Sequence, residues 1–571
     1  MFTVKSFRYN APDPLPRPDR AWPDATITTA PRWLSTDLRD GNQALARPMS
    51  PARKQAMFDL LVSMGFKEIE VGFPVASKSD HAFVRTLIER ELIPDDVRIT
   101  VLVQARDELI MKTAESLEGA PRAAIHLYSA TSPFFRRMVY GMNRDECKDL
   151  AVHGTRLVLK YAERLLGDCD LAFQYSPEHF ADTEPDFSLE VCEAVMDAWQ
   201  PDEQHEIILN FPTTVERTMP NVFADRIEWL HRNLSRREHV CLSVHPHNDR
   251  GTGVATAELA MLAGAQRIEG CLFGNGERAG NVDLVTLGLN LFTHGVDPGL
   301  DFSDLGRIRR TVEQCTGLPV HPRHPYGGSL VYTSFSGSHQ DAIKKASDAM
   351  AAEAEAAETG VDRLPWQVPY LPLDPRDVGR TYETLVRITS QSGKGGLAYV
   401  LGQWQGLQPP RDLLVEFAGL VQARADAEGG EISPGQVLGM FQREYVRALE
   451  APTFPEPADG PVLTVLYVDG GGIDAVPDRV DAVERVRHLL TERGFDLRAV
   501  HHTDRSSRKS RMDMAVYAEC QAGGRAFWGV GLECDIETAA LSAVCSALVR
   551  AGAHLAATGG GSWNSSNEPK H

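Results

Sequence analysis

The stretch CLSVHPHNDRGTG, residues 241–253, is the part of the sequence from which the fold can be worked out. It begins as a short, mostly apolar run and continues into a polar segment with two histidines, His245 and His247, one residue apart. In a β-strand, residues i and i+2 point to the same face of the sheet. We therefore expect a strand over residues 241–247, with both imidazoles on one side.

Seven more runs of this kind lie between residues 30 and 300, and helical patterns separate them. The eight expected strands are RWLST (32–36), EIEVGF (68–73), ITVLVQ (99–104), AAIHLY (123–128), LAFQYS (171–176), EIILNFP (206–212), CLSVHPH (241–247) and RIEGCLFG (267–274). In one intervening helix, Ser50 suits the N-cap, Pro51 the first helical position and Gly65 the end. Eight strand–helix units in about 270 residues predict an α/β fold, a (β/α)8 TIM barrel. The alternative is a doubly wound sheet, which seldom has eight evenly spaced units.

The pattern changes after residue 300. Residues 342–360 are rich in alanine and glutamate and predict a helix, whereas the proline-punctuated stretch 364–377 cannot continue one. A second proline-rich segment, 450–461, marks a boundary before a separate α+β domain. We expect an N-terminal arm (1–30), the TIM barrel (31–310), helical linker subdomains (311–450), the α+β domain (461–556) and a disordered tail (557–571).

Composition and charge restrict the class of protein. Hydrophobic residues make up 43% of the chain and charged residues 24%, as in ordinary globular proteins. The net charge of −19 argues against nucleic acid or an anionic membrane as a main partner. Nine cysteines without CxxC spacing are typical of a reduced, cytoplasmic protein. The N-terminus lacks the apolar segment of a secretory signal, and no run of about 18 apolar residues predicts a membrane helix.

Polar and ionisable residues recur where the expected strands end, which is the face on which TIM-barrel enzymes carry their chemistry. Asp40 follows the first strand, and His245 and His247 close the seventh. Two imidazoles and one carboxylate with open positions suit a divalent cation that also binds substrate oxygens; Mg, Mn and Zn all remain open. The alternative is two histidines that are simply hydrogen-bonded near a strand end. Residues 248–250 are expected to form a loop that sets the orientation of the imidazoles.

Three further residues at strand ends have both a functional and a structural interpretation. Arg39 is either a fixed cation that stabilises a developing oxyanion or one half of a structural salt bridge. Glu178 is either a general base, or a group that orients a water, or a loop carboxylate. Thr214 suits a hydrogen bond to a substrate carboxylate, but the residue type alone decides little.

Two glycine-rich stretches do not fit nucleotide binding. GNGERAGN (274–281) has the spacing G-x-G-x-x-x-G and follows the last expected strand, so it is not a dinucleotide fingerprint. SGKGG (392–396) lacks the spacing of a Walker loop. No Ser/His/Asp set and no catalytic cysteine stands out.

Six motifs carry a resemblance to one enzyme family. They are LRDGNQ (38–43), HPHNDRGTG (245–253), EGCLFGNGERAGNVDLVTL (269–287), HPYGGSLVYTSFSGSHQDAIKK (324–345), VPYLPLDPRDVGRTYE (368–383) and SQSGKGG (390–396). Together they resemble the longer, actinobacterial-type form of the 2-isopropylmalate synthases. The resemblance covers residues 5–450 closely and 460–556 loosely. Homocitrate and citramalate synthases share only the barrel motifs.

The resemblance implies an acyltransferase that condenses acetyl-CoA with 2-oxoisovalerate and water to give 2-isopropylmalate and CoA, the first committed step of leucine biosynthesis. It implies a divalent metal held by Asp40, His245 and His247, with Asn281 as a further metal-site residue. A monovalent cation such as K⁺ is an expected activator.

The resemblance also implies roles for other residues. Arg39 would neutralise the alkoxide that forms in the condensation. The 2-oxo acid pocket would consist of His126, Ser176, Glu178 and Thr214. The candidates for removing a proton from the acetyl methyl group are Glu178, His339 and Tyr370. In the family, the segment that contains the last two residues reaches the partner's active site, which implies a homodimer.

The α+β domain resembles the leucine-sensing regulatory domain of the family mainly through residues 527–551, and its first half departs from the family pattern. The G-x-G-N-G-P stretch of the family is replaced by a different sequence, and residues 501–513 are basic where the family has an acidic, histidine-bearing loop. Leucine feedback is therefore expected to be weak, altered or absent. Three alternatives remain: a specialised paralogue that condenses acetyl-CoA with a related 2-oxo acid, a metal-dependent aldolase or lyase, and a non-catalytic regulatory homologue.

Overall fold

The computed structural model describes residues 19–380, 388, 394–428, 432–446, 462–471, 488, 499–505, 514–522, 525–533 and 536–557. The chain divides into two compact units, one formed by residues 1–331 and 375–380 and the other by residues 332–374 and 381–571.

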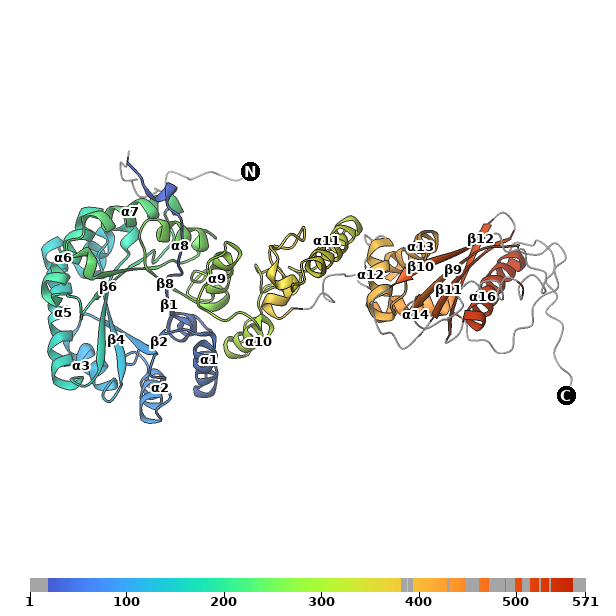
Figure 1. The fold of residues 1–571 in the computed structure, drawn as a ribbon. Helices are drawn as coiled ribbons and strands as arrows, with labels where there is room; N and C mark the ends of the chain where they lie inside the picture. The colour runs from blue at the N-terminus through green and yellow to red at the C-terminus, as the bar shows by residue number, and fades with distance from the viewer. Residues whose placement is uncertain are drawn as a thin grey trace, which may run out of the picture. The chain divides into compact units, whose positions relative to one another are not determined.

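The first unit is built on a closed barrel of eight parallel strands, which follow one another round the barrel in sequence order (Figure 1). The strands are β1 (Arg32–Ser35), β2 (Glu68–Gly72), β3 (Arg98–Gln104), β4 (Arg122–Ala130), β5 (Asp170–Glu178), β6 (Ile207–Pro212), β7 (Val240–His245) and β8 (Arg267–Gly270). Because β1 pairs with β8 as well as with β2, the sheet has no free edge. The predicted TIM barrel is confirmed, and the doubly wound sheet, which is open, is excluded.

Two expected strands end earlier than the sequence suggested. β7 stops at His245, and His247 lies beyond it in an isolated antiparallel bridge with Asn281. The prediction that both histidines belong to one strand was therefore wrong in this detail. β8 stops at Gly270, because Phe273 has a φ of 56° and turns the chain out of the extended conformation.

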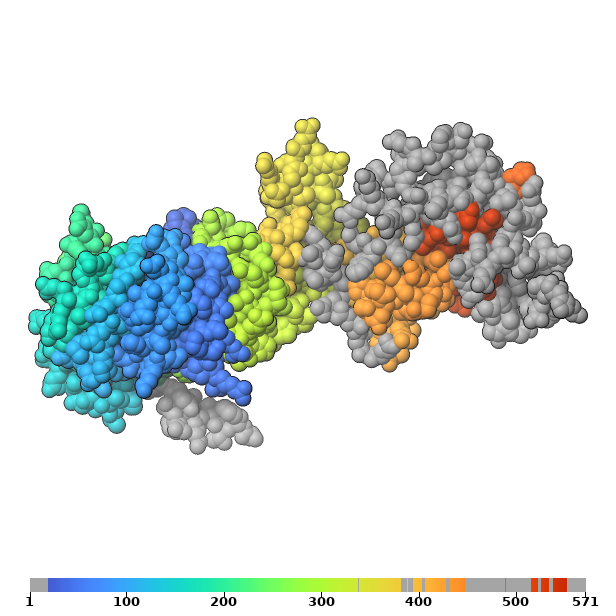
Figure 2. Space-filling view, turned by 90° about the horizontal axis from the view of Figure 1, so that it is seen from below, coloured from blue at the N-terminus to red at the C-terminus, as the bar shows by residue number. Residues whose placement is uncertain are grey.

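Helices cover the outside of the barrel, and from the side drawn in Figure 2 the first unit presents a continuous surface of blue to green segments. They are α1 (Pro51–Met64), α2 (Lys78–Glu89), α3 (Asp107–Ser116), α5 (Arg144–Leu165), α6 (Pro185–Trp199), α7 (Pro220–Asn233), α8 (Gly253–Leu262), α9 (Leu284–Thr293) and α10 (Leu305–Thr316). α1 has the expected ends: the Ser50 side chain accepts a hydrogen bond from the Arg53 N–H, and Gly65 closes the helix with a φ of 100°.

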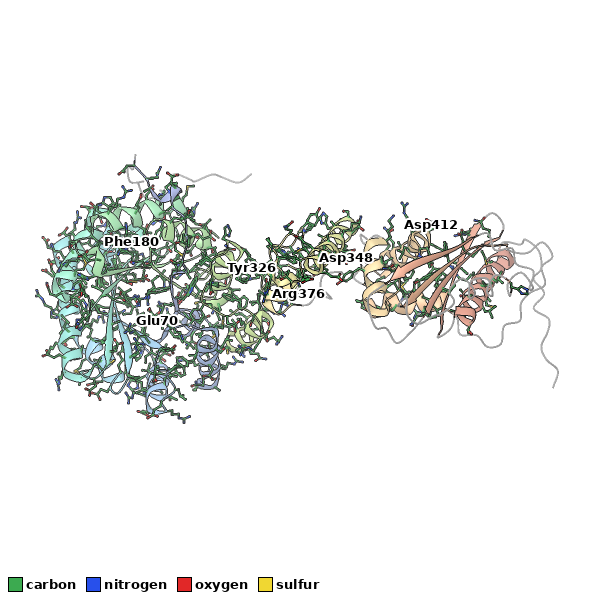
Figure 3. The ribbon with its side chains drawn as sticks, in the orientation of Figure 1. Glu70, Phe180, Tyr326, Asp348, Arg376 and Asp412 are labelled. Carbon is green, nitrogen blue, oxygen red and sulfur yellow. The ribbon has the colours of Figure 1, made fainter. Side chains whose placement is uncertain are left out.

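The interior of the barrel changes character along its axis. At one level, four small apolar side chains, Ala124, Ala172, Ile208 and Cys241, pack together. Two residues further along β5, β6 and β7, on the same face of each strand, the side chains are polar. The buried polar residues of the barrel strands include Glu70, Thr100, Gln174, Asn210, Ser243 and Glu269. Glu70 lies inside the ring of helices (Figure 3). The floor of the carboxyl-terminal face is therefore a polar layer, which rests on an apolar one.

The second unit combines helices with a small sheet (Figure 1). Its helices are α11 (Gly337–Ala356), α12 (Lys394–Gln405), α13 (Arg411–Glu428), α14 (Pro434–Tyr445) and α16 (Ile536–Ala557). α11 corresponds to the helix expected over residues 342–360 but begins and ends a few residues earlier. After Arg363 the chain runs without a helix up to Pro375, in agreement with its proline content.

The sheet of the second unit has the order β10-β9-β11-β12, in which β9 and β10 are parallel and β11 is antiparallel to both of its neighbours. Its strands are β9 (Val462–Gly471), β10 (Ala499–Arg505), β11 (Met514–Ala522) and β12 (Arg525–Glu533). α16 packs against this sheet through small apolar side chains. The predicted α+β fold is therefore present. The first part of the basic stretch belongs to β10, whereas residues 506–513 lie outside the described residues.

The described part of the N-terminal arm lies against α7. Arg20 forms two hydrogen bonds of 2.7 Å with the fully buried Asp225, and the Trp22 indole donates to the same carboxylate over 2.9 Å. Residues 1–18 and the tail after residue 557 lie outside the described residues, so the boundaries of the arm, the linker and the tail stay predictions. All eight cysteines in the described residues are free thiols. Among the helices that the structure describes, none has the length and apolar character needed to cross a bilayer.

Candidate metal and active site

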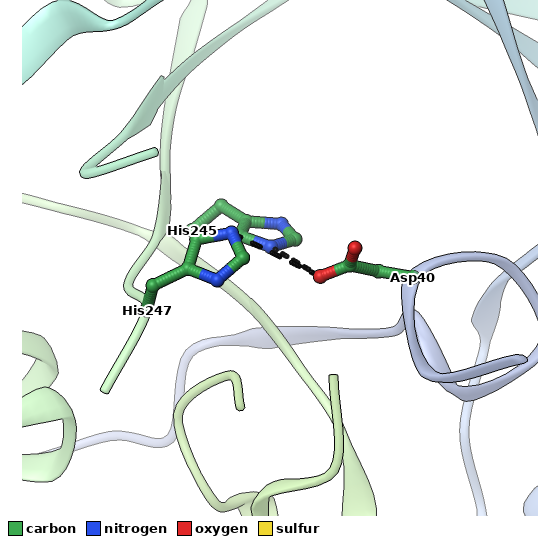
Figure 4. A group of neighbouring side chains, drawn as sticks. All are labelled: Asp40, His245 and His247. Atoms are coloured by element: carbon green, nitrogen blue, oxygen red, sulfur yellow. Dashed lines mark ion pairs between the residues drawn. The ribbon is translucent and has the colours of Figure 1, made fainter. Parts of the chain in front are cut away.

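Three predicted ligand residues converge at the carboxyl ends of the strands (Figure 4). Asp40 lies in the π-helical turn Asp37–Gly41 directly after β1. Its Oδ2 is 3.5 Å from Nε2 of His245 and 3.8 Å from Nε2 of His247. The two imidazole rings are 5.0 Å apart, and all three side chains are buried. One carboxylate oxygen thus faces two imidazole nitrogens in a site shielded from water.

The charges of these groups are strongly coupled. Burial alone would lower the pKa of His245, but the neighbouring carboxylates of Asp40 and Glu269 raise it to about 9. Burial, together with the charge on His245, lowers the pKa of His247 to about 3. Burial opposes ionisation of Asp40, yet Arg39 and the histidines hold the pKa of that carboxyl well below its usual range. The site therefore holds an ionised carboxylate and at least one neutral imidazole at neutral pH.

Buried polar atoms without a partner show that the site fits a cation. Asp40 Oδ2, His247 Nδ1 and Asn281 Oδ1 are buried and have no hydrogen-bond partner. The amide nitrogen of Asn281 donates to the Thr36 hydroxyl over 2.9 Å, and this contact fixes which side of the amide carries the free oxygen. Two imidazoles, a carboxylate and an amide oxygen form a donor set suited to a divalent metal. The described residues thus contain a candidate metal site.

The loop GNGERAGN brings Asn281 to this site. Asn281 pairs with His247, and the Asn248 N–H donates to the Gly280 carbonyl over 2.9 Å. Gly280 has a φ of 99°, and a Cβ there would lie 1.9 Å from the carbonyl oxygen of Gly274. The glycines of this stretch therefore allow a tight turn beside the histidines, which explains them without a phosphate-binding loop.

Arg39 is held by a glutamate that the sequence did not single out. Its Nε donates to Oε2 of Glu70 over 2.6 Å, and its Nη1 lies 3.4 Å from Oδ1 of Asp40. Burial opposes the charge of Glu70, but Arg39 and His126 lower the pKa of that carboxyl. The guanidinium is therefore fixed between two carboxylates at the edge of the metal site.

His126 and Ser176 lie together on neighbouring strands. His126 Nδ1 is 2.8 Å from Oε1 of Glu70, and its Nε2 is 2.7 Å from the Ser176 hydroxyl. Ser176 also accepts a hydrogen bond of 2.9 Å from the Asn210 amide. Arg39, Glu70, His126 and Ser176 thus form one continuous chain of polar contacts inside the barrel.

Glu178 and Thr214 lie at the ends of β5 and β6. Burial raises the pKa of Glu178, and the nearby charge of Arg39 only partly offsets this effect. Thr214 has a φ of 53°, and its hydroxyl accepts a hydrogen bond of 2.9 Å from the His179 N–H. A carboxyl with a raised pKa is suited to exchange protons near neutral pH. The Thr214 hydroxyl keeps its own proton for donation.

The loop after the histidines does not hold the imidazoles directly. The Asp249 carboxylate instead accepts two hydrogen bonds from Arg278, over 2.7 and 3.0 Å, and the Asn248 side chain accepts from the Gly253 N–H. The hydrogen bonds of the histidines come from elsewhere: the Glu269 carboxylate accepts from His245, and the Thr213 hydroxyl accepts from the His247 backbone N–H over 2.8 Å. The predicted role of residues 248–250 is corrected accordingly, because this loop joins neighbouring loops of the barrel face.

His339 and Tyr370 belong to the second unit. Their rings stack with centroids 4.0 Å apart, and the Tyr370 side chain is 60% exposed. Tyr370 also has a φ of 65°, which is rare for an aromatic residue. The structure thus brings these two predicted catalytic residues together within the second unit. Their action on a partner's barrel stays a prediction.

Two buried glutamates complete the site, and sequence reasoning passed over both. Glu70 and Glu269 are 0% exposed, and each forms a hydrogen bond to one of the site histidines. A signal was present, since both occur within short apolar strands, where a charged residue must find a partner. The pattern could not reveal which partner.

Comparison with known proteins agrees with the fold. A family model described as HMGL-like matches residues 30–312, and one described as alpha-isopropylmalate synthase, post-catalytic domain-like, matches residues 329–402. A 2-isopropylmalate synthase from Streptosporangium roseum is 68% identical over 96% of this chain and 95% of that protein. The chain belongs to the 2-isopropylmalate synthase family.

Further members of the 2-isopropylmalate synthase family match over nearly the whole chain. The protein of that name from Thermobifida fusca is 56% identical over 95% of this chain and 97% of its own length. Among solved structures, the hydroxymethylglutaryl-CoA lyase from Pseudomonas aeruginosa is 19% identical, with a TM-score of 0.42 over 52% of this chain and 97% of that one. The resemblance drawn from the motifs is thus confirmed, from the barrel through the linker.

Proposed function

We propose that the chain condenses acetyl-CoA with 2-oxoisovalerate and water to give 2-isopropylmalate and CoA, the reaction for which its relatives are named. The observation that carries the proposal is the convergence of Arg39 with Asp40, His245 and His247 in one buried site. An aldolase or lyase would have no use for the matched post-catalytic segment. A non-catalytic homologue would not need the buried atoms without partners.

The cation site is assigned to Asp40, His245 and His247, with Asn281 as a fourth donor, for Mg²⁺, Mn²⁺ or Zn²⁺. When bound, such an ion acts as a Lewis acid and as a template for an α-keto carboxylate. One ligand atom from each of Asp40, His245 and His247 lies within 4.8 Å of the other two, and Oδ2 of Asp40 has no hydrogen-bond partner. The remaining positions are left for substrate oxygens.

Condensation forms a carbon–carbon bond between the acetyl methyl carbon and the keto carbon, and the keto oxygen becomes an alkoxide. The Arg39 guanidinium, fixed by Glu70, stands beside this site as a positive charge that needs no reorganisation. His126, Ser176 and Thr214 are proposed to bind the 2-oxo acid by hydrogen bonds. Water then hydrolyses the thioester, which releases the CoA thiol and a carboxylate.

The methyl group of acetyl-CoA must first lose a proton. Glu178 is our candidate base within the barrel, since burial raises the pKa of its carboxyl above the ordinary range. His339 and Tyr370 are the candidates from the second unit. We infer that they act in a homodimer on the partner's barrel, and that K⁺ activates the enzyme. We further infer that the protein is cytoplasmic and that its α+β domain responds weakly, if at all, to leucine.

The test measures CoA thiol release from acetyl-CoA with a panel of 2-oxo acids, in the presence of Mg²⁺, Mn²⁺ or Zn²⁺, with and without leucine. We expect 2-oxoisovalerate to give the highest kcat/KM. A higher value with a related 2-oxo acid identifies the specialised paralogue instead. Absence of thiol release with every keto acid overturns the proposal.

Asp40→Asn tests the metal site in the same assay, and Asp59→Asn is its matched control. Asp59 lies on the exposed face of α1, where its carboxylate accepts only from Gln55. We expect Asp40→Asn to lose thiol release and Asp59→Asn to keep it. Equal rates for both variants would remove Asp40 from the mechanism.

A further inference from the structure

The two site histidines differ in what holds the nitrogen that faces away from Asp40. His245 Nδ1 lies 3.1 Å from Oε2 of Glu269. His247 Nδ1 is buried and has no hydrogen-bond partner. An imidazole binds a metal through one nitrogen, and a hydrogen bond at the other fixes its tautomer and its orientation. Only one of the two imidazoles has such support from a side chain.

The two oxygens of Glu269 have separate duties. Oε1 accepts hydrogen bonds from the Gln174 amide over 2.7 Å, from Arg267 Nη1 over 2.6 Å and from the Ser243 hydroxyl over 3.0 Å. Oε2 instead faces His245 Nδ1. The carboxylate is 0% exposed, so its position is set by these contacts and not by solvent.

The support of Glu269 extends through the interior of the barrel. Arg267 is fully buried, and its Nε donates to Glu68 over 2.7 Å. Glu68 in turn accepts from Arg32 over 2.7 Å. A buried pair of this kind contributes little net stability, because desolvation offsets the attraction of the charges. This series of buried charges runs from Arg32 through Glu68 and Arg267 to Glu269, which contacts the imidazole of His245.

We propose that Glu269 is the positioning residue of the metal site: its Oε2 accepts the proton of His245 Nδ1 and so aims the Nε2 lone pair at the cation. This inference rests on the proposed metal site and adds a residue that lies outside the ligand set. Its alternative is that Glu269 serves only as the counterion of Arg267. The two roles involve different oxygens and can be separated.

Glu269→Gln separates them through the chemistry of the amide. The amide oxygen takes the place of Oε1, where three donors converge, and the amide N–H group then faces His245 Nδ1. That group is a donor, so it stabilises the tautomer of His245 that carries its proton on Nε2. In this tautomer Nε2 has no free lone pair with which to bind a metal. Ser243→Ala is the matched control, because the Ser243 hydroxyl touches Oε1 and Arg267 but not the imidazole.

The experiment titrates metal-free, full-length protein with Mn²⁺ in a calorimeter, and circular dichroism of each metal-free variant checks the fold. We expect Glu269→Gln to bind Mn²⁺ about 10- to 100-fold more weakly than the unaltered protein, and Ser243→Ala to bind within about threefold of it. Equal affinity of Glu269→Gln and the unaltered protein would overturn the inference. Equal weakening by Ser243→Ala would also do so, since it assigns the effect to the counterion network.

Glu269→Asp serves if the glutamine variant does not fold. It keeps the charge but withdraws the carboxylate from His245 by one methylene, so weaker Mn²⁺ binding is again expected, and unchanged binding contradicts the inference. Mn²⁺ binding and CoA release by the unaltered protein test the proposed function separately. If the unaltered protein binds Mn²⁺ and releases CoA while both Glu269 variants bind normally, only the inference fails. If the unaltered protein binds no divalent ion, the metal site itself fails, and the inference with it.

Discussion

The interior of the barrel and the interior of the C-terminal sheet are built in opposite ways. In the barrel, charged and polar side chains such as Glu70, Arg267 and Glu269 are buried at the expense of desolvation. Beneath α16, the core consists of small apolar side chains, among them Ala543 and Ala547. The first interior leaves polar atoms without partners, whereas the second brings backbones into close contact.

Two glycines show how close that contact is. A Cβ at Gly529 would lie 2.2 Å from the Ala543 carbonyl oxygen, and one at Gly531 would lie 1.9 Å from the Ala539 carbonyl oxygen. β12 and α16 therefore pack with no room for a methyl group between them. Substitutions in the barrel interior should therefore change chemistry more than folding, and substitutions under α16 should do the reverse.

The largest effect is expected for His247→Ala, which removes a candidate ligand from an already folded barrel. Loss of a Lewis acid worth several kcal/mol corresponds to a fall of about 10³-fold or more in kcat/KM. CoA release and Mn²⁺ titration measure the effect, and the melting temperature of the metal-free protein should hardly change. His205→Ala is the control, since that imidazole is 63% exposed. Unchanged turnover of His247→Ala would falsify the ligand role.

Glu178→Gln is expected to have the next largest effect, a fall of about 10²- to 10⁴-fold in kcat. The reaction needs the ionised carboxylate, and burial raises the pKa of Glu178 above its ordinary value of about 4.3. Activity should therefore fall as the pH drops through that raised pKa, and this acid limb should be absent from the residual activity of the variant. Glu118→Gln, at an exposed turn, is the matched control. An unchanged pH profile in the variant would assign the proton transfer to another group.

Much of the fold and part of the site could be predicted from the sequence. Strand periodicity predicted the barrel, and the positions of Asp40 and His245 at strand ends placed them on one face. Glu70 and Glu269 were passed over, because alternation along a strand shows that a side chain points inward but not which partner it meets. The contact between His339 and Tyr370 depends on tertiary packing, which the local sequence pattern does not reveal.

Gly531→Ala tests the close packing of β12 on α16 in the second unit. Overpacking of this kind costs about 1–3 kcal/mol, so the second unit should unfold at a lower temperature or denaturant concentration while Mn²⁺ affinity stays unchanged. Gly419→Ala is the matched control, since it lies in α13 with nothing within 4 Å of the added methyl group. That substitution should stabilise by up to about 1 kcal/mol. If both variants had the same stability, the packing of β12 on α16 would have room for a methyl group, and the proposed overpacking would be wrong.

The smallest effect is expected for Arg550, a partly buried cation that joins α16 to two of the preceding helices. Arg550 of α16 pairs with Glu416 of α13 over 2.6 Å and Glu444 of α14 over 2.9 Å, and lies 4.4 Å from the Tyr445 ring. Arg550→Gln should cost about 0.5–1.5 kcal/mol of unfolding free energy, since the carboxylates that lose their partner are only partly shielded from water. The exposed Arg525→Gln should cost less than about 0.5 kcal/mol. Because this cluster joins α16 to the helices before the sheet, hydrogen exchange should rise in α13 and α14 as well. A change confined to α16 would mean that the helices and the sheet fold independently.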